Sequence, residues 1–483
     1  MDRLSLVRNA RVAAWLMLAM SALLPAAARA TVPGHWDAVT SANGTDIDQI
    51  ATVRTPDGRL HVIWHRQTSA SSSSLAQTVL AANGSVGIPQ EIASSWAGVG
   101  DAVALRAASG NLLVFSAATR GVSATDPLDS VEQWTSSDGG GTWALTPTPV
   151  ADGAGFADPL GGALGPDGTT PFLAWSTTDG VFVHRGVDPP GTSVNLEQAA
   201  GFGCCGYDPG VALDSSSGAI GVAWYALVDQ GDAVYARTLD AGSGAPTGTT
   251  MRMPGTVDSV APDQRVGLTG LPGRSGLFAA YNGGGASQST VLAWRVGAAT
   301  ATTLSINHST ELRDPTITAT PDGRLWVAWS AAARIWARRS NPTLSQWGAV
   351  TSIPVRQGTG TVYKLALNAT AHALDVFAAF APQTGSGVQT WHSQMLAGLT
   401  LTASPARLKL RKGKRGAIKL TVTDAGVPVQ GARVTLSGHT SGTNKAGSVT
   451  VKVGPITHAA SPTARAGKSG YTPASAQVHI GLR

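Results

Sequence analysis

Charged side chains are distributed very unevenly, and each part of the chain nearly lacks one kind. Residues 31–400 contain a single lysine, Lys364, and hold 18 Lys and Arg against 27 Asp and Glu, a balance of −9. Residues 401–483 contain a single acid, Asp424, against 13 Lys and Arg, a balance of +12. The sequence pI of about 9.5 therefore describes neither part, and two surfaces of opposite charge are expected.

Long apolar segments are missing after residue 30, which predicts that no later segment spans a membrane. Within the first thirty residues, three arginines precede an apolar run from Val12 to Leu24. The sequence Ala28-Arg29-Ala30 then has the small-x-small pattern of a signal-peptide cleavage site. Residues 1–30 are therefore interpreted as a signal peptide, and the mature protein is expected to be secreted and extracellular.

The chain also lacks the motifs of several enzyme classes. Its ten histidines form no H-x-H or H-E-x-x-H pattern, and no P-loop, dinucleotide fingerprint or G-x-S-x-G elbow stands in a strand–helix context. The only cysteines, Cys204 and Cys205, have no further Cys and no nearby His to complete a metal-ligand set. Thiols of exported proteins tend to oxidise, so we expect a vicinal disulfide, with buried reduced thiols or an intermolecular bridge as alternatives.

What the chain does contain is a pattern that recurs with a period of roughly 50 residues. Each copy has an Asp, a strand, a turn and an apolar strand that ends in an aromatic residue, as in "DQIATVRTPDGRLHVIW" (48–64) and "DPTITATPDGRLWVAW" (314–329). The turn positions are Gly58, Gly110, Gly168, Gly218, Gly273, Gly323 and His372. A third strand follows in most copies, for example at 180–186 and 333–339. Seven such units predict an all-β, seven-bladed β-propeller, with six or eight blades as alternatives.

The stretch "QWTSSDGGGTWALT" (133–146) forms the hairpin between a third and a fourth strand. An Asp in such a turn accepts hydrogen bonds from backbone amides, and a Gly provides a positive φ. The stretch resembles the Asp-box, or bacterial neuraminidase repeat, of sialidase-like propellers. The resemblance implies a sialidase-like fold and a structural turn on the outer edge, away from the substrate site. The residues that carry it are Ser136, Asp138, Gly140, Thr142 and Trp143.

Ligands of propellers bind at the axial funnel, where each innermost strand begins. The repeat places seven residues there: Asp48, Asp101, Asp158, Asp208, Asp263, Asp314 and Tyr363. Carboxylates that converge on one axis repel one another unless cations, donors or protons meet them. One hypothesis is that each Asp only caps backbone amides at its strand start. The other is an acidic mouth that binds Ca²⁺ or a polar ligand such as a sugar, with donors from Arg265, Arg313 and Lys364.

The resemblance to sialidases further implies three arginines around a substrate carboxylate and a Tyr–Glu nucleophilic pair. The arginine of the family's R-I-P motif is replaced here by Asp48, and the Arg-x-Pro of "VRTP" (53–56) lies out of register, close to the turn. None of the four glutamates between 31 and 400 falls in a matching setting; they are Glu91, Glu132, Glu197 and Glu311. No catalytic residue is therefore assigned.

From residue 399 the composition changes, and "GVPVQGARVTL" followed by "TNKAGSVTVKV" resembles bacterial immunoglobulin-like and carboxypeptidase-regulatory-like β-sandwich modules. The resemblance implies a spacer or adhesion unit without catalytic residues. Six basic residues cluster here: Lys409, Arg411, Lys412, Lys414, Arg415 and Lys419. They predict a solvated face that attracts anionic polymers of the cell envelope, or that docks on the acidic propeller. Nucleic acid is not expected, because no aromatic residues interleave with the basic ones.

The predicted organisation is a signal peptide (1–30), an N-terminal lead-in (31–44), a β-propeller (45–398) and an Ig-like β-sandwich (399–483). The predicted function is an extracellular binding protein that recognises glycans or cell-surface polymers through the funnel. An exo-sialidase-like glycoside hydrolase and a non-catalytic adhesion module are the alternatives. No cofactor other than Ca²⁺ is considered, and the oligomeric state is not predicted.

Overall fold

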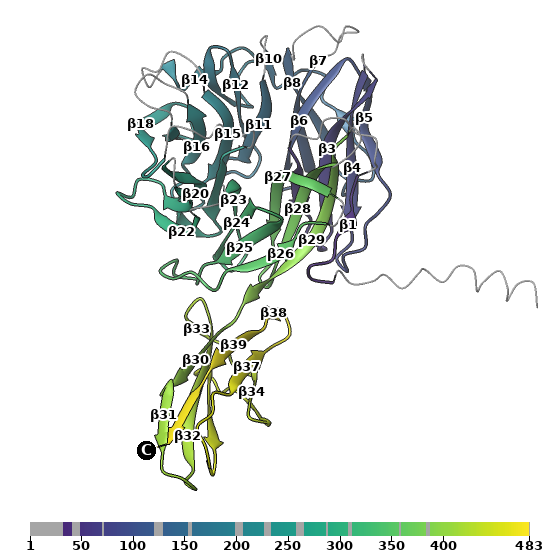
Figure 1. The fold of residues 1–483 in the computed structure, drawn as a ribbon. Helices are drawn as coiled ribbons and strands as arrows, with labels where there is room; N and C mark the ends of the chain where they lie inside the picture. The colour runs from purple at the N-terminus through teal and green to yellow at the C-terminus, as the bar shows by residue number, and fades with distance from the viewer. Residues whose placement is uncertain are drawn as a thin grey trace, which may run out of the picture.

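The computed structural model describes residues 32–40, 49–69, 72–119, 129–152, 157–198, 206–226, 233–256, 265–285, 288–307, 312–356, 359–382 and 387–482 (Figure 1). In these ranges the regular structure consists of β-strands, which confirms the prediction of an all-β protein. No helix in the described part is long and apolar enough to cross a membrane. The predicted signal peptide, Asp48, Asp263 and both cysteines lie outside the described residues.

The described strands up to Gly398 form seven antiparallel sheets. The first contains β2 (Ala51–Arg54), β3 (Leu60–Ser69), β4 (Ser72–Leu80) and β5 (Gln90–Trp96). The second contains β6 (Gly98–Arg106), β7 (Leu112–Thr119), β8 (Ser130–Ser136), β9 (Ala144–Leu145) and β10 (Ala151–Asp152). The third contains β11 (Ala157–Leu164), β12 (Pro171–Thr177), β13 (Gly180–Arg185) and β14 (Val194–Asn195).

The remaining sheets of this part repeat the same order. The fourth contains β15 (Gly206–Leu213), β16 (Ile220–Ala226), β17 (Ala233–Leu239) and β18 (Pro246–Arg252). The fifth contains β19 (Gly267–Leu271), β20 (Arg274–Gly285), β21 (Gln288–Arg295) and β22 (Thr302–Asn307). The sixth contains β23 (Arg313–Ala319), β24 (Leu325–Ala331), β25 (Arg334–Arg339) and β26 (Thr351–Pro354). The seventh contains β27 (Thr359–Ala369), β28 (Ala373–Pro382), β29 (Gln389–Gly398) and β1 (Asp37–Ala38).

These sheets lie side by side in a ring. Each first strand contacts the first strand of the next sheet, from β2 to β6 and so on to β27, and β27 contacts β2 again. Apolar residues fill the space between neighbouring sheets; for example, one cluster joins Phe172 of the third sheet to Trp224 of the fourth. Second strands such as β7 and β24 are buried along their whole length, because a sheet lies against each of their faces. This arrangement is the one expected of a propeller.

Two features close the ring, one within its last sheet and one between its first and last sheets. β1 pairs with β29, so part of the segment interpreted as a lead-in completes the seventh sheet. Arg54, at the end of β2, donates from Nε to Asn368 Oδ1 at 2.9 Å and forms an ion pair with Asp375. Arg54, the arginine of the Arg-x-Pro sequence in "VRTP", therefore connects the first sheet to the seventh and helps to close the ring.

The turn between β8 and β9 has the hydrogen bonds expected from its sequence. Asp138 Oδ1 accepts from the backbone amides of Gly141 and Thr142, each at 2.9 Å, and Ser136 Oγ donates to it at 2.8 Å. Gly140 has a φ of 89°. The half-buried Trp143 packs against the apolar cluster between the first two sheets. The turn between β25 and β26 is a reduced copy, in which Asn341 Oδ1 accepts from Ser345 N at 3.0 Å.

The segment after Gly398 forms a separate group of strands below the ring (Figure 1). One sheet contains β30 (Thr400–Ser404), β32 (Gly416–Asp424), β33 (Val427–Pro428) and β36 (Ser448–Val453). Another contains β34 (Arg433–Leu436), β35 (His439–Gly442), β37 (Thr463–Gly467) and β39 (Ala474–Gln477), while β31 (Arg407–Leu410) pairs with β40 (His479–Leu482). Leu420 and Val434 lie in their shared apolar core, and all six clustered basic residues are exposed.

The two groups of strands meet at a buried ion pair. Asp424, the only acid of the C-terminal part, is 2% exposed; its Oδ2 accepts from Arg324 Nη1 at 2.9 Å and from Arg339 Nη2. The Arg339 guanidinium also lies over the ring of Tyr471. Tyr471 belongs to β38 (Tyr471–Thr472), which pairs with β29 of the ring.

Candidate functional site: the mouth of the central channel

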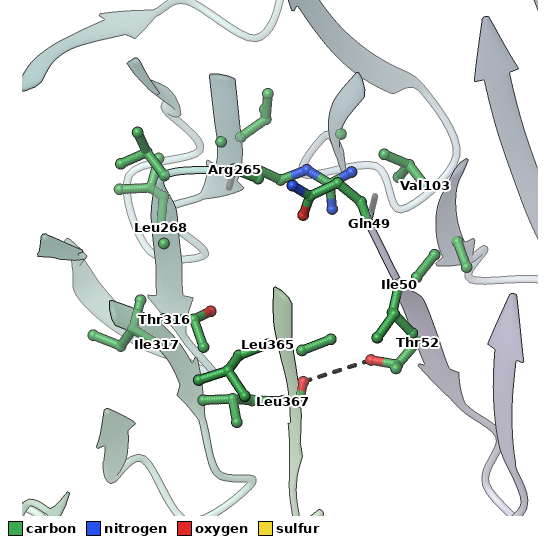
Figure 2. Close-up of a pocket in the computed structure, with 18 of the residues that line it drawn as sticks. Gln49, Ile50, Thr52, Val103, Arg265, Leu268, Thr316, Ile317, Leu365 and Leu367 are labelled. Carbon is green, nitrogen blue, oxygen red and sulfur yellow. Dashed lines mark hydrogen bonds between the residues drawn. The ribbon is translucent and has the colours of Figure 1, made fainter. Parts of the chain in front are cut away.

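A cavity of about 210 Å³ lies along the axis of the ring, and all seven first strands contribute to its wall (Figure 2). Apolar side chains such as Val103, Leu268, Ile317 and Leu365 line it, but polar atoms make up the larger part of its accessible lining. Figure 2 shows Arg265 and Gln49 close together, and both residues precede the first strands of their sheets. The channel therefore has a mixed lining, with two polar side chains at the end where the first strands begin.

The recurring aspartates lie at irregularities in the first strands. The pairing register shifts between Val99 and Ala102 in β6, between Tyr207 and Gly210 in β15, and between Arg313 and Thr316 in β23. The same shift flanks Asp158 in β11. These shifts indicate β-bulges, in which a residue is left out of the ladder. A proline after the Asp is tolerated there because a bulge residue has no ladder hydrogen bond to donate.

Asp101 is turned into the protein. Its side chain is fully buried, and its Oδ1 lies 2.8 Å from Nδ1 of His65, within β3 of the neighbouring sheet. A buried carboxylate held in this way joins two sheets and does not face a ligand. Asp101 therefore fits the scaffold hypothesis better than the acidic-mouth hypothesis, although the hydrogen bond is to a histidine and not to strand-start amides.

Asp208 and Asp314 share an unusual backbone conformation, with φ of 53° and 52°. Asp208 is buried, and its carbonyl oxygen accepts from Val266 N of the next sheet at 2.9 Å. Asp314 is half-buried, and its Oδ2 accepts from Ser330 Oγ at 3.2 Å. Positive φ is costly for residues other than glycine, and Asp is among those that tolerate it best. The Asp of the repeat is thus explained in part by the bulge itself.

Basic side chains reach the same end of the channel. Arg265 precedes β19, yet its Nη2 lies 3.4 Å from the carbonyl oxygen of Ala102 in β6, so it extends over the channel toward the second sheet. Arg313 is exposed at the start of β23. Lys364 is only 2% exposed and lies within β27, so it is too buried to donate to a ligand in this conformation.

The other predicted mouth residues are placed only in part. Asp158 lies in β11 and Tyr363 in β27, both first strands of their sheets, but their side chains are not described. Asp48 and Asp263 are outside the described residues. Among the described residues, no three His, Cys, Asp or Glu side chains are grouped so that they could hold a metal ion, so this part of the chain offers no support for a Ca²⁺ site.

The described glutamates do not supply a nucleophilic pair at the mouth. Glu197 is fully buried and accepts from Gly206 N and from Trp224 Nε1, each at 3.1 Å; burial raises its pKa. Glu132 is also fully buried and accepts from Ser130 Oγ at 3.0 Å. Glu91, in the outermost strand β5 of the first sheet, is paired with Arg66 of β3. Glu311 lies outside the described residues.

Sequence reasoning missed two contributors to this region. His65 directly follows Trp64, the aromatic residue that closes the apolar run of its repeat, and so it lies on the mouth side of that run in β3. That position was the available signal. Gln49, next to the first predicted Asp, lines the channel beside Arg265 and was overlooked because only the Asp position was compared between copies.

Comparison with known proteins assigns no family. No protein-family model and no curated protein matches the chain. A protein of unknown function from Dyadobacter fermentans is 13% identical over 76% of this chain and 99% of that chain, with a TM-score of 0.44. Hydrazine synthase from Kuenenia stuttgartiensis is 13% identical over 73% and 96%, with a TM-score of 0.45. An ulvan lyase from a new family of polysaccharide lyases is 12% identical over 59% and 76%, with a TM-score of 0.42. Likenesses at this level do not assign an activity.

Proposed function

We propose that the chain is an exported binding protein that recognises glycans or cell-surface polymers at the channel mouth. In this proposal a seven-bladed, sialidase-like β-propeller (45–398) carries the ligand site, and an Ig-like β-sandwich (399–483) presents the basic cluster to envelope polyanions. The observation that carries the proposal is the channel itself, which Gln49 and Arg265 line at the end where the exposed Arg313 begins β23.

The size of the channel favours recognition of a chain end or a substituent. Its volume of about 210 Å³ is below the roughly 300–1,000 Å³ that is usual for small-molecule pockets. A polymer would therefore lie across the mouth and insert only a terminal group. Arginine side chains bind carboxylates and sulfates through paired hydrogen bonds, so the basic residues at the mouth favour an acidic group on the ligand.

Binding without catalysis is supported by the described glutamates. Glu132 and Glu197 are each fully buried and already accept hydrogen bonds, so neither can attack a sugar at the mouth. Sialidase chemistry would also need three convergent arginines, and the described mouth contributes Arg265 and Arg313.

A glycan array probed with the full-length protein tests the proposal. Arg313→Gln should weaken the strongest signals about tenfold, because a charge-assisted hydrogen bond is lost. Arg106→Gln, which changes an exposed arginine at the far end of β6, should leave them unchanged. Absence of binding to every glycan would refute the proposal. Turnover of fluorogenic sialosides or other aryl glycosides above a heat-killed control would replace it with a hydrolase.

The proposed role of the basic cluster has its own test. Retention of the full-length protein on anionic cell-wall material should fall steeply as salt is raised, because exposed charges are screened within about 10 Å at 0.1 M ionic strength. Changing Lys409, Arg411, Lys412 and Lys414 together to Gln should have the same effect at low salt. Retention that is insensitive to both treatments would contradict the electrostatic account.

A further inference from the structure

A second cavity, with a volume of about 480 Å³, lies between the fifth and sixth sheets. Its wall comes from the start of β20, the end of β21, the turn after β21, the start of β24 and the turn between β25 and β26. In antiparallel sheets these ends lie opposite the starts of the first strands. The cavity therefore opens at the far end of the ring from the channel mouth and is separate from the site described above.

Two arginines give this cavity a positive charge. Arg274 and Arg295 both line it and are both exposed. Arg274 Nη1 is directed to the carbonyl oxygens of Gly323 and Pro342 across the sheet boundary, and Arg295 Nη2 lies 3.5 Å from Ser275 Oγ. Within the described residues, neither guanidinium forms an ion pair with a carboxylate. Most of their N–H groups therefore stay available to an anion.

A nearby acid does not cancel this charge. Asp214 lies close to the start of β20, where its carboxylate accepts from the backbone amide of Gly276 at 3.0 Å. It also accepts from the backbone amide of Ser216 at 3.1 Å. The Asp214 carboxylate is thus hydrogen-bonded by one amide of its own, fourth sheet, that of Ser216, and by one amide of the fifth sheet, that of Gly276 in β20. The guanidinium groups on the cavity wall are not among its hydrogen-bond partners.

The rest of the cavity wall combines aromatic and apolar side chains with the hydroxyl side chains of Ser275, Thr300, Thr302 and Thr343. The half-buried Trp347, in the turn between β25 and β26, lines it together with Phe278, Trp294 and Leu344. A pyranose ring has a face of C–H groups, and such a face gains dispersion energy when it lies on an aromatic ring. At about 480 Å³ the cavity is within the roughly 300–1,000 Å³ typical of ligand pockets.

We propose that this cavity binds an anionic saccharide unit, with its carboxylate or sulfate on Arg274 and Arg295 and its apolar face against Trp347. Uronic acids and sulfate esters share this chemistry. The proposal concerns a different surface from the channel mouth and does not depend on the function proposed there.

Isothermal titration calorimetry of the full-length protein tests it with four probes: glucuronic acid, galactose 6-sulfate, galactose and sodium sulfate. One or both of the acidic sugars should bind, galactose should not, and sodium sulfate should bind at least tenfold more weakly than the best acidic sugar. The acidic sugar with the higher affinity shows whether the cavity prefers a carboxylate or a sulfate ester. Failure of both to bind, or equal affinity for inorganic sulfate, would overturn the proposal.

Matched variants locate the binding. Arg295→Gln should weaken binding about tenfold, because one charge-assisted contact is lost, and Trp347→Leu should weaken the sugars but not inorganic sulfate. Arg106→Gln should have no effect. If Arg313→Gln abolishes binding and Arg295→Gln does not, the ligand is at the mouth and this assignment is wrong. If a variant folds poorly, the unaltered protein still provides a test, because its affinity for the acidic sugar should fall as salt is added. Binding that does not depend on salt would contradict the proposal.

Discussion

The ring of sheets and the C-terminal sandwich carry opposite net charge, but the contact between them inverts this pattern. The acidic ring contributes two arginines, Arg324 and Arg339, and the basic sandwich contributes its only acid, Asp424. The six clustered lysines and arginines are all exposed, and they lie in β31, in β32 and in the turn that connects these two strands. Net charge therefore describes what each part presents to solvent, while a buried ion pair and the pairing of β38 with β29 join them.

The strongest test of this comparison removes the buried acid. Asp424→Ala leaves Arg339, which is 3% exposed, without its carboxylate, and breaking a buried ion pair costs about 3–5 kcal/mol of stability. Denaturant unfolding and limited proteolysis near Gly398 would measure the loss. Lys419→Ala, an exposed charge on the same strand, should change the free energy of unfolding by less than about 0.5 kcal/mol.

A double-mutant cycle separates the ion pair from other effects at the joint. Arg339→Leu alone should destabilise the protein, and combining it with Asp424→Ala should cost clearly less than the sum of the single changes. Simple additivity would mean that Asp424 and Arg339 contribute independently, and the interpretation of the joint as one coupled contact would be wrong.

The two regions also differ in how closely their strands approach one another. In the ring, a Cβ added to Gly210 would lie 2.1 Å from the carbonyl oxygen of Val266 in the next sheet. Gly210→Ala should therefore destabilise the protein by about 1–3 kcal/mol or more, because the backbone must shift. In the sandwich, a Cβ on Gly442 meets nothing within 4 Å, so Gly442→Ala should be nearly neutral in thermal unfolding. Equal effects of the two substitutions would show that close packing is not what distinguishes the regions.

The strands and turns of the repeat could be predicted because they depend on local sequence. The third strands expected at 180–186 and 333–339 are β13 and β25, and the turn positions Gly58 and Gly323 lie in turns, where both glycines have positive φ. Local patterns are informative here because alternation and turn residues are short-range signals. The repeat also placed Asp158, Asp208 and Asp314 on the first strands of their sheets.

The remaining features depend on residues that are distant in sequence. Two residues, Asp37 and Ala38, carry no periodicity, and only their pairing with β29 shows that they complete the last sheet. The hydrogen bond between His65 and Asp101 joins two sheets, so no single repeat contains it. Asp424 was recognised as the only acid of its region, but a charge count cannot show that it would be buried against two arginines.

The smallest expected effect is on the pH dependence of stability. It concerns two turns, one at Asp138 in the ring and one at Asn444 in the sandwich, in which a side-chain oxygen accepts hydrogen bonds from backbone amides. In the ring, Asp138 accepts from Thr142 N, Ser136 Oγ and Thr142 Oγ1, and these hydrogen bonds hold its pKa well below the ordinary value of 3.8. In the sandwich, Asn444 Oδ1 accepts from Ala446 N at 3.0 Å and Ser448 N at 3.1 Å without a charge. In both turns, therefore, a side-chain oxygen accepts hydrogen bonds from backbone amides, but only the turn of Asp138 should depend on pH.

A carboxylate with a depressed pKa stabilises the folded protein above its unfolded pKa, and this stabilisation is lost as pH falls through the folded pKa. The difference in Tm between the unaltered protein and Asp138→Asn should accordingly be largest at neutral pH and should shrink below about pH 4. The change in Tm caused by Asn444→Ala should be the same at neutral pH and below pH 4, since the asparagine side chain does not bind or release a proton in this range. If the difference in Tm between the unaltered protein and Asp138→Asn persists unchanged in acid, the charge of the carboxylate does not stabilise this turn. The turns at Asp138 and Asn444 would then not differ in their dependence on pH.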